Sequence, residues 1–132
     1  MWGILAAVIF SQIIGTIWYS PFFLGKPWLN NNFPGKTADQ IGREGNFQMA
    51  LVATVVSQTC LSLIVHYVLL SYLGITCVYT ALKIAFGLAA IFTASDIPHL
   101  VFSIRPFVVF IIDHLYDAAV FASICVSVVY FK

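Results

Sequence analysis

The sequence predicts an all-α integral membrane bundle of four transmembrane helices, with an interfacial loop after the first. Composition is the first observation that predicts this fold class: 61% of the 132 residues are hydrophobic and only 8% are charged, against roughly a quarter charged in soluble domains. So few charges cannot cover the surface of a water-soluble globule. The second observation is that four apolar stretches reach the ~20 residues that a helix needs to cross the hydrocarbon core. We therefore expect a membrane protein rather than a soluble enzyme or a nucleic-acid-binding protein.

The four predicted spans are separated by loops of unequal length and form one transmembrane domain over residues 1–132. They cover residues 2–20, 47–72, 75–98 and 106–131. Gly74 is a natural end for the second span, and Pro106 stands where the first turn of a helix accepts proline. The spans contain stretches that are apolar on every side, which contradicts the alternating pattern of a membrane β-barrel. Helices also pair their own backbone polar groups in lipid.

The loop over residues 21–46 is the one sizeable connection, and its first half is unusually apolar. The aromatic residues Trp18, Tyr19 and Trp28 predict a belt at the membrane interface, where such amphipathic rings are enriched. Lys26 is expected at the level of the lipid headgroups, because its long stem lets the charge reach water. This loop is therefore predicted to lie against the membrane surface.

A capping box is predicted later in the same loop. Thr37 is followed three residues later by Gln40, and this spacing lets each side chain bind the other residue's backbone N–H. A helix is therefore expected to begin near Ala38 and to run outside the membrane before the second span.

The basic side chains predict an orientation for the helices. The loops over residues 21–46 and 99–105 carry Lys26, Lys36, Arg43 and Arg105, whereas the opposite side carries only Lys132 and the α-amino group. By the positive-inside rule, both loops face the cytoplasm or its equivalent, and both termini lie on the other side.

Residues at the end of the first span resemble a known family. The sequence contains Trp18-Tyr19-Ser20-Pro21, followed by Leu24-Gly25-Lys26 and Trp28. This is similar to the WYSP…FGKxW signature of the small membrane proteins of domain of unknown function family 1761, with Leu24 where the family usually has Phe. The run Arg105-Pro106, Phe110, Ile111, Asp113 and Tyr116 resembles that family's RP…LF-I-N…GYH motif. The resemblance implies four membrane helices and assigns no chemistry.

Ionisable and amide side chains within the spans are the candidate functional residues. A charge at the centre of a spanning helix costs roughly 2.5–3.5 kcal/mol on insertion scales, so such groups usually face a bundle interior or water. The predicted intramembrane polar network consists of Gln12, Gln58, His66, Lys83, Asp96, Asp113, His114 and Asp117. Asp113 and Asp117 are four residues apart and share one helix face.

A structural interpretation of this network is the first of three. Lys83 would neutralise Asp117, Arg105 would neutralise Asp113 or Asp96, and the glutamines would hydrogen-bond between helices. The chain would then be a non-catalytic, lipid-embedded accessory or structural subunit of a larger membrane assembly. Its expected partners are membrane lipids and either other membrane subunits or further copies of itself.

A transport interpretation is the alternative function. The path would run through Asp96, Asp113 and Asp117 from the loop over residues 99–105, and then through Lys83 and His66 to the opposite side. Titratable groups in series suit a proton, ion or small-solute path. Pro98 would break the third helix, where irregular backbone could line a cavity. Four helices leave little room for a pore, so transport predicts an oligomer or a second subunit.

A metal site is the third interpretation. Asp96, His99, Asp113, His114 and Asp117 supply carboxylate and imidazole groups from facing helices, a ligand set that suits zinc, iron or manganese. His99 is expected at a different height from Asp117, however, and the Glu-x-x-His pattern is absent. Lipid-modifying catalysis has no motif in its support. We therefore expect no catalytic activity, no metal and no cofactor.

Overall fold

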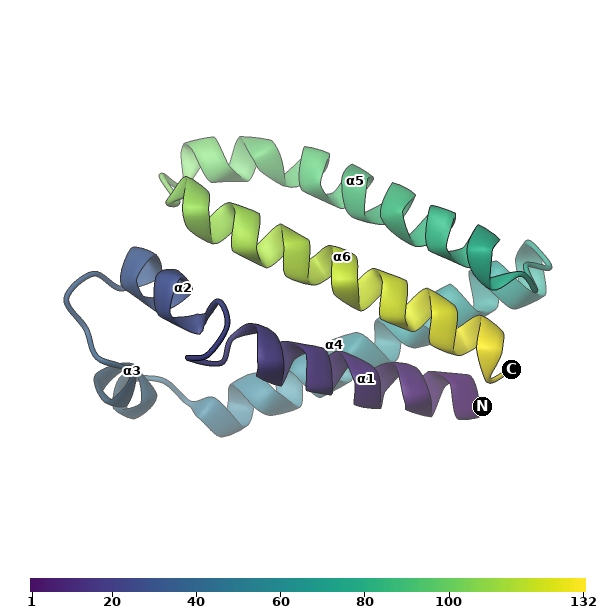
Figure 1. The fold of residues 1–132 in the computed structure, drawn as a ribbon, viewed down its shortest axis with the longest axis horizontal. Coiled ribbons are helices and arrows are strands. Elements are labelled where there is room, and N and C mark those ends of the chain that lie inside the picture. The colour runs from purple at the N-terminus through teal and green to yellow at the C-terminus, as the bar shows by residue number, and fades with distance from the viewer.

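The computed structural model describes all residues 1–132, and it contains helices and no strands. The elements, in chain order, are α1 (Trp2–Trp18), α2 (Gly25–Asn32), α3 (Ala38–Glu44), α4 (Phe47–His66), the π-helix η1 (Tyr67–Tyr72), α5 (Val78–Phe102) and α6 (Phe107–Tyr130) (Figure 1). Three segments are long and apolar enough to cross a membrane, namely α4 with η1, α5 and α6, and α1 is a shorter apolar helix. The predicted fold class, a four-helix membrane bundle, is confirmed.

The third spanning helix differs most from its predicted bounds. It occupies residues 78–102 rather than 75–98, because Pro98 lies inside α5 and does not end it. Spanning helices tolerate an internal proline where neighbouring groups satisfy the freed backbone. The helix closes four residues later, where the backbone N–H and the hydroxyl of Ser103 both donate to the carbonyl of His99. The prediction that Pro98 breaks this helix is therefore wrong.

Two predicted local signals are confirmed. Gly74 has a φ of 61° just after η1, and Ile75 N–H donates to Leu69 O at 2.7 Å to close the turn. Thr37 N–H donates to Gln40 Oε1 at 2.8 Å, and Gln40 N–H donates to Thr37 Oγ1 at 3.3 Å, which completes the capping box.

The helix that begins at this capping box is separate from the second span. It ends at Glu44 as α3, and α4 begins at Phe47 with its own cap, because Asn46 Oδ1 accepts a hydrogen bond from Met49 N–H. The two glycines near this junction, Gly42 and Gly45, disfavour a continuous helix. The expected extension of the second span outside the membrane is therefore a distinct short helix.

Helix α6 is the centre of the bundle and contacts α1, α2, α4 and α5 (Figure 1). α1 approaches it through the buried residues Gly3, Ala7 and Ser11, which are four apart and share one face. α5 approaches it through a second stripe of the same spacing, the buried residues Ala81, Ala85 and Ala89. Small side chains let two helix backbones come close together in lipid, where packing replaces the hydrophobic effect as the main attraction between helices.

The bundle is open on one side. α5 packs mainly against α6, and α4 packs against α1 and α6, so that α4 and α5 are not closely packed along their lengths. An apolar groove of about 550 Å³ lies between them, with Phe121 of α6 among its lining residues. This open side exposes the interior of the bundle to the surrounding lipid.

We expect the substitution Gly3→Leu to lower stability by about 1–3 kcal/mol, the usual cost of overpacking. A Cβ at Gly3 would lie 2.9 Å from the backbone O of Ser127 and 3.0 Å from the Cα of Val128, so α1 would have to move away from α6. Thermal unfolding in detergent, followed by circular dichroism, measures the effect.

The matched control is Gly87→Leu on α5, because no atom lies within 4 Å of the position that its Cβ would take. This substitution is expected to leave the midpoint of unfolding near that of the wild type. Equal losses in the two variants would contradict a role for Gly3 in close helix packing.

Candidate functional site

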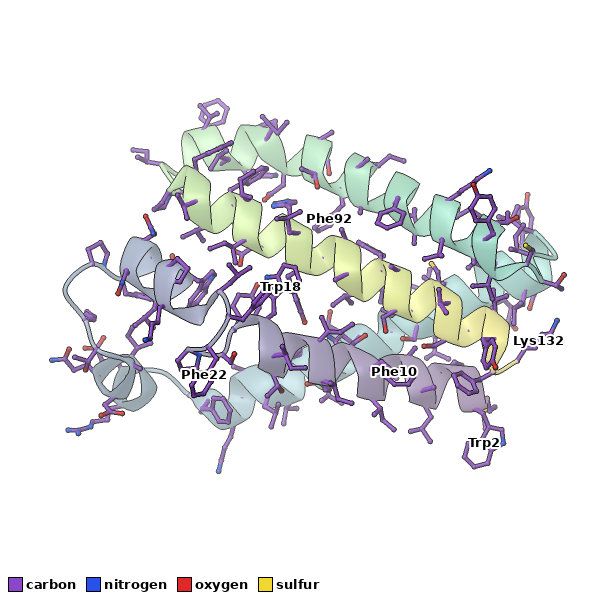
Figure 2. All side chains as sticks on the ribbon, viewed as in Figure 1. Trp2, Phe10, Trp18, Phe22, Phe92 and Lys132 are labelled. Atoms are coloured by element: carbon purple, nitrogen blue, oxygen red, sulfur yellow. The ribbon has the colours of Figure 1, made fainter.

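The carboxyl group of Asp113 is bound by two aromatic side chains from outside α6. Tyr19 Oη and Trp28 Nε1 each donate a hydrogen bond of 2.8 Å to Asp113 Oδ1. Trp18 Nε1 donates a third bond, of 3.1 Å, to the backbone O of Ile112, and Figure 2 shows Trp18 at the end of α1 beside α6. We call Trp18, Tyr19, Trp28 and Asp113 the Asp113 clamp. It joins α1, α2 and α6.

The rings of the clamp also pack against one another. The ring centroid of Tyr19 lies 5.4 Å from that of Trp28 and 5.2 Å from that of Tyr116, both in edge-to-face geometry. The aromatic belt of Trp18, Tyr19 and Trp28 at the membrane interface stays a prediction, and the structure adds that their polar atoms are turned toward α6. A carboxyl group in a span needs donors, and Trp and Tyr bring a polar tip on an apolar ring.

The other residues of the interfacial motif form the turn between α1 and α2. Gly25 N–H donates to Ser20 O at 3.0 Å, and a Cβ on Gly25 would lie 2.2 Å from the backbone O of Tyr19. Only glycine fits at this position. Ser20 Oγ donates to the carbonyl of Ile17, whereas Pro21 and Lys26 are exposed. The tight turn returns the chain so that Trp28 reaches Asp113.

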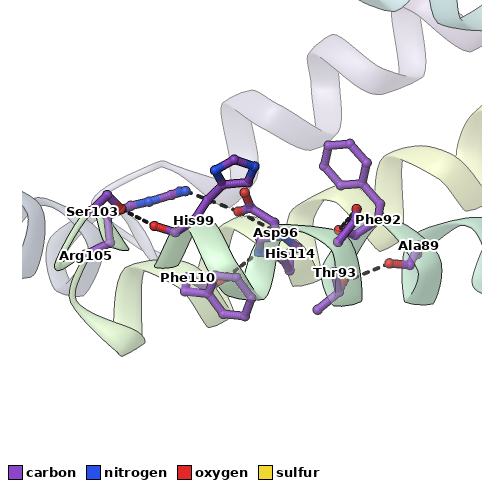
Figure 3. A network of polar contacts seen from close by, with 10 residues as sticks. Ala89, Phe92, Thr93, Asp96, His99, Ser103, Arg105, Phe110 and His114 are labelled. Carbon is purple, nitrogen blue, oxygen red and sulfur yellow. Dashed lines mark hydrogen bonds and ion pairs between the residues drawn. The ribbon is translucent and has the colours of Figure 1, made fainter. Parts of the chain in front are cut away.

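A second polar cluster joins α5 and α6 near the turn between them (Figure 3). Arg105 Nη2 donates to Asp96 Oδ2 at 3.2 Å, and His114 Nε2 lies 3.5 Å from the same oxygen. His114 is buried, and its Nδ1 lies 2.9 Å from the backbone O of Phe110. The predicted neutralisation of Asp96 by Arg105 is confirmed. The alternative, in which Arg105 neutralises Asp113, is wrong, and the side chain of His99 is exposed and makes no hydrogen bond.

A third set of polar contacts connects α1, α4 and α6 across the bundle. Gln12 Nε2 donates to Gln58 Oε1 at 2.6 Å, and Gln58 Nε2 donates to Tyr116 Oη at 3.0 Å. This chain joins α1, α4 and α6 and confirms that the two glutamines hydrogen-bond between helices. Tyr116 was not predicted as a member of the network. The signal that could have found it is its spacing of three residues from Asp113, which places it on the same side of α6.

Asp117 is the one acidic residue of the network that makes no hydrogen bond or ion pair within the chain. It lies near the middle of α6 and lines a pocket of about 530 Å³ between α4, α5 and α6. Ser57, Gln58 and Tyr116 line the same pocket, and Phe92 contributes from α5. Asp117 therefore faces the open side of the bundle.

Two other predicted members lie apart from the network. Lys83 is exposed on α5, where its Nζ lies 4.5 Å from the ring centroid of Tyr79, and it forms no ion pair. The expected pairing of Lys83 with Asp117 is therefore wrong. The reason is rotational: Lys83 is two residues from Ala81, or about 200° around the helix from the face that packs on α6. His66 ends α4 with its Nδ1 buried and without a partner.

The arrangement gives no geometric support to a metal site. No group of three His, Cys, Asp or Glu side chains comes together in a way that could hold a metal ion. The carboxyl groups that were considered as ligands are instead directed to different neighbours, Asp113 to α1 and α2, and Asp96 to Arg105.

We expect Asp113→Leu to destabilise the protein by roughly 1.5–3 kcal/mol, the range for hydrogen bonds to charged groups. The substitution Asp113→Asn keeps an acceptor oxygen for Tyr19 and Trp28, so it should lower the stability clearly less. Thermal unfolding in detergent distinguishes the two variants. Equal losses for Leu and Asn would mean that the acceptor oxygen contributes nothing to the clamp.

The comparison with known proteins places the whole chain in one family. The family model described as Protein of unknown function (DUF1761) matches residues 2–129. No curated protein and no solved structure matches the chain. The chain therefore belongs to the DUF1761 family, which is described as being of unknown function.

Proposed function

We propose that this chain is a non-catalytic, lipid-embedded protein that serves as an accessory or structural subunit of a larger membrane assembly. The observation that supports this function is that most polar groups in the spans bind each other. Asp113 is held by Tyr19 and Trp28, Asp96 by Arg105, and Gln58 by its partners on α1 and α6. Such bonds fix the register of the helices, which is a structural task.

The outer surface leaves room for partners. Only 20 of the 132 residues are buried, and α5 covers α6 with one narrow face while its apolar side chains, such as Phe86 and Ile91, point outward. Such an apolar surface can pack against lipid or against partner helices. The mass of the native assembly distinguishes these two cases.

We expect the protein, extracted from its own membrane in a mild detergent, to migrate as a complex larger than one 14.6 kDa chain. Native mass spectrometry measures the assembly, and chemical cross-linking in intact membranes before extraction provides the control. A single chain in both experiments would contradict the proposal.

Figure 1 supports the predicted orientation as part of the same proposal. The helices α2 and α3 and the turn between α5 and α6 lie at one end of the bundle, and both termini lie at the other. The four basic residues of the two loops are therefore gathered at a single end. We place that end on the cytoplasmic or equivalent side.

Transport of a small solute is the second candidate function, and one observation favours it. The carboxyl group of Asp117 lies in a pocket near the middle of a span without a partner in the chain, as a binding group in a transporter does. The wider proton path has less support, because no hydrogen bond or ion pair connects Asp117 to Lys83 or His66.

A flux measurement separates a structural role from proton transport or proton-coupled solute transport. Wild-type protein and Asp117→Asn are reconstituted in liposomes that contain a pH-sensitive dye. The subunit proposal expects the same background proton leak for both proteins and for empty liposomes. A leak that requires Asp117 would favour transport and contradict a purely structural role.

A further inference from the structure

The apolar groove between α4 and α5 has the dimensions of a ligand site. Its volume is about 550 Å³, within the range of roughly 300–1,000 Å³ that is typical of small-molecule pockets. Eleven of its twelve lining residues are hydrophobic, among them Val65 and Leu69 on one wall and Ile84 and Leu88 on the other. The chemistry of this groove suits an aliphatic chain.

The groove adjoins the pocket that contains Asp117. Leu61, Phe92 and Phe121 line both cavities, so that an apolar half and a polar half share a boundary. The polar half is lined by Asp117, Ser57, Gln58 and Tyr116. We call the two cavities together the α4–α5 cleft.

The cleft is accessible from the lipid. Leu88 and Phe92 are 37% and 50% exposed, and Ile91 between them is 68% exposed. A molecule dissolved in the bilayer can therefore reach Asp117 from the side, without passing through water. No other helix of this chain covers the opening, since α5 packs mainly against α6.

We propose that the α4–α5 cleft binds a single-chain amphiphile with a protonated amine headgroup. The ammonium group would lie against the carboxyl group of Asp117, which has no partner in the chain, and would find an acceptor in the hydroxyl of Ser57. An ammonium has three donors and no acceptor, so oxygen atoms are the partners that it requires. The alkyl chain would follow the groove along α4 toward η1. An anionic headgroup is disfavoured by the same carboxyl group.

The carboxyl group of Asp117 favours this occupant over an apolar partner helix, because it has no partner in the chain and an ammonium group can donate to it. An extended alkyl chain is narrow enough to lie between the apolar walls of the groove. The proposed site does not depend on whether the protein acts as a subunit, because the cleft is formed by this chain alone.

The test compares three probes of the same chain length: dodecylamine, dodecanol and dodecyl sulfate. Each is titrated, below its micelle-forming concentration, into purified protein in a mild neutral detergent, and the midpoint of thermal unfolding is recorded. Wild-type protein should be stabilised by the amine saturably and at lower concentration than by the alcohol, and should not be stabilised by the sulfate. Equal stabilisation by the amine and the alcohol would overturn the proposal without any variant.

Two pairs of variants locate the site. Asp117→Asn should weaken amine binding on the order of tenfold to a hundredfold, the value of one charge-assisted contact, and Asp39→Asn, at an exposed acid of α3, should leave it unchanged. Leu88→Trp should fill the groove and weaken both amine and alcohol, whereas Phe86→Trp, exposed on the same helix and outside the groove, should weaken neither. The unfolding midpoints without probe verify that each variant folds.

Other results would overturn the assignment. Amine binding that is equally strong in the wild type and in Asp117→Asn would show that the carboxyl group is not the partner. A Leu88→Trp variant that changes the native mass and leaves the amine response intact would assign the groove to a protein partner instead.

Discussion

The position of α6 between two helices with small contact faces is the constraint on which the rest of the structure depends. α1 and α5 each present to α6 a stripe of small residues at a spacing of four, and at Gly3 a Cβ would lie 2.9 Å from the backbone of α6. Between helices in lipid, contact of this kind replaces the hydrophobic effect. The contacts with both neighbours fix the rotation of α6 about its own axis. This rotation decides which neighbour each polar side chain of α6 faces. Asp113 faces α1 and α2, His114 faces α5, and Asp117 faces the cleft.

The Asp113 clamp shows how a carboxyl group can be held in a span without a second charge. An ion pair in a low-dielectric interior must offset the desolvation of both partners. Trp28 and Tyr19 instead offer one donor each on a ring that is otherwise apolar and packs against its neighbours. At the edge of the bundle, where Arg105 is about one third exposed, the more usual pairing of Asp96 with a cation is found. The partners of the two acids therefore differ with their surroundings: neutral aromatic donors within the bundle and a cation at its edge.

Much of the fold could be predicted from the sequence, because the composition and length of an apolar segment are enough to identify a membrane span. The bounds of the second span, the end at Gly74, the capping box at Thr37 and the pairing of Asp96 with Arg105 all follow from local chemistry. The hydrogen bonds of Trp18, Tyr19 and Trp28 to α6 do not follow from local chemistry. A ring with an apolar body and a polar tip suits the membrane interface and a carboxyl group on another helix equally well.

The candidate site was less predictable, because depth along a helix is easier to estimate than rotation about it. Lys83 and Asp117 both lie within predicted spans, but Lys83 is exposed on the side of α5 away from α6. The stripe of Ala81, Ala85 and Ala89 marks the packing face of α5, and it could have shown that Lys83 lies on the opposite side. The open side between α4 and α5 arises because these consecutive helices pack on different neighbours, α4 on α1 and α6 and α5 mainly on α6, and no local pattern encodes that.

The chain begins and ends at the same end of the bundle, where Trp2 and Lys132 lie (Figure 2) and where a Cβ on Gly3 would lie 2.9 Å from the backbone O of Ser127. Neighbouring ends are the condition under which a protein tolerates circular permutation. A short linker between the ends of α6 and α1, with the chain opened in the loop before α4, would therefore leave every helix contact in place. The new ends would emerge on the opposite face of the membrane, so that the same bundle could carry its attachments on either side.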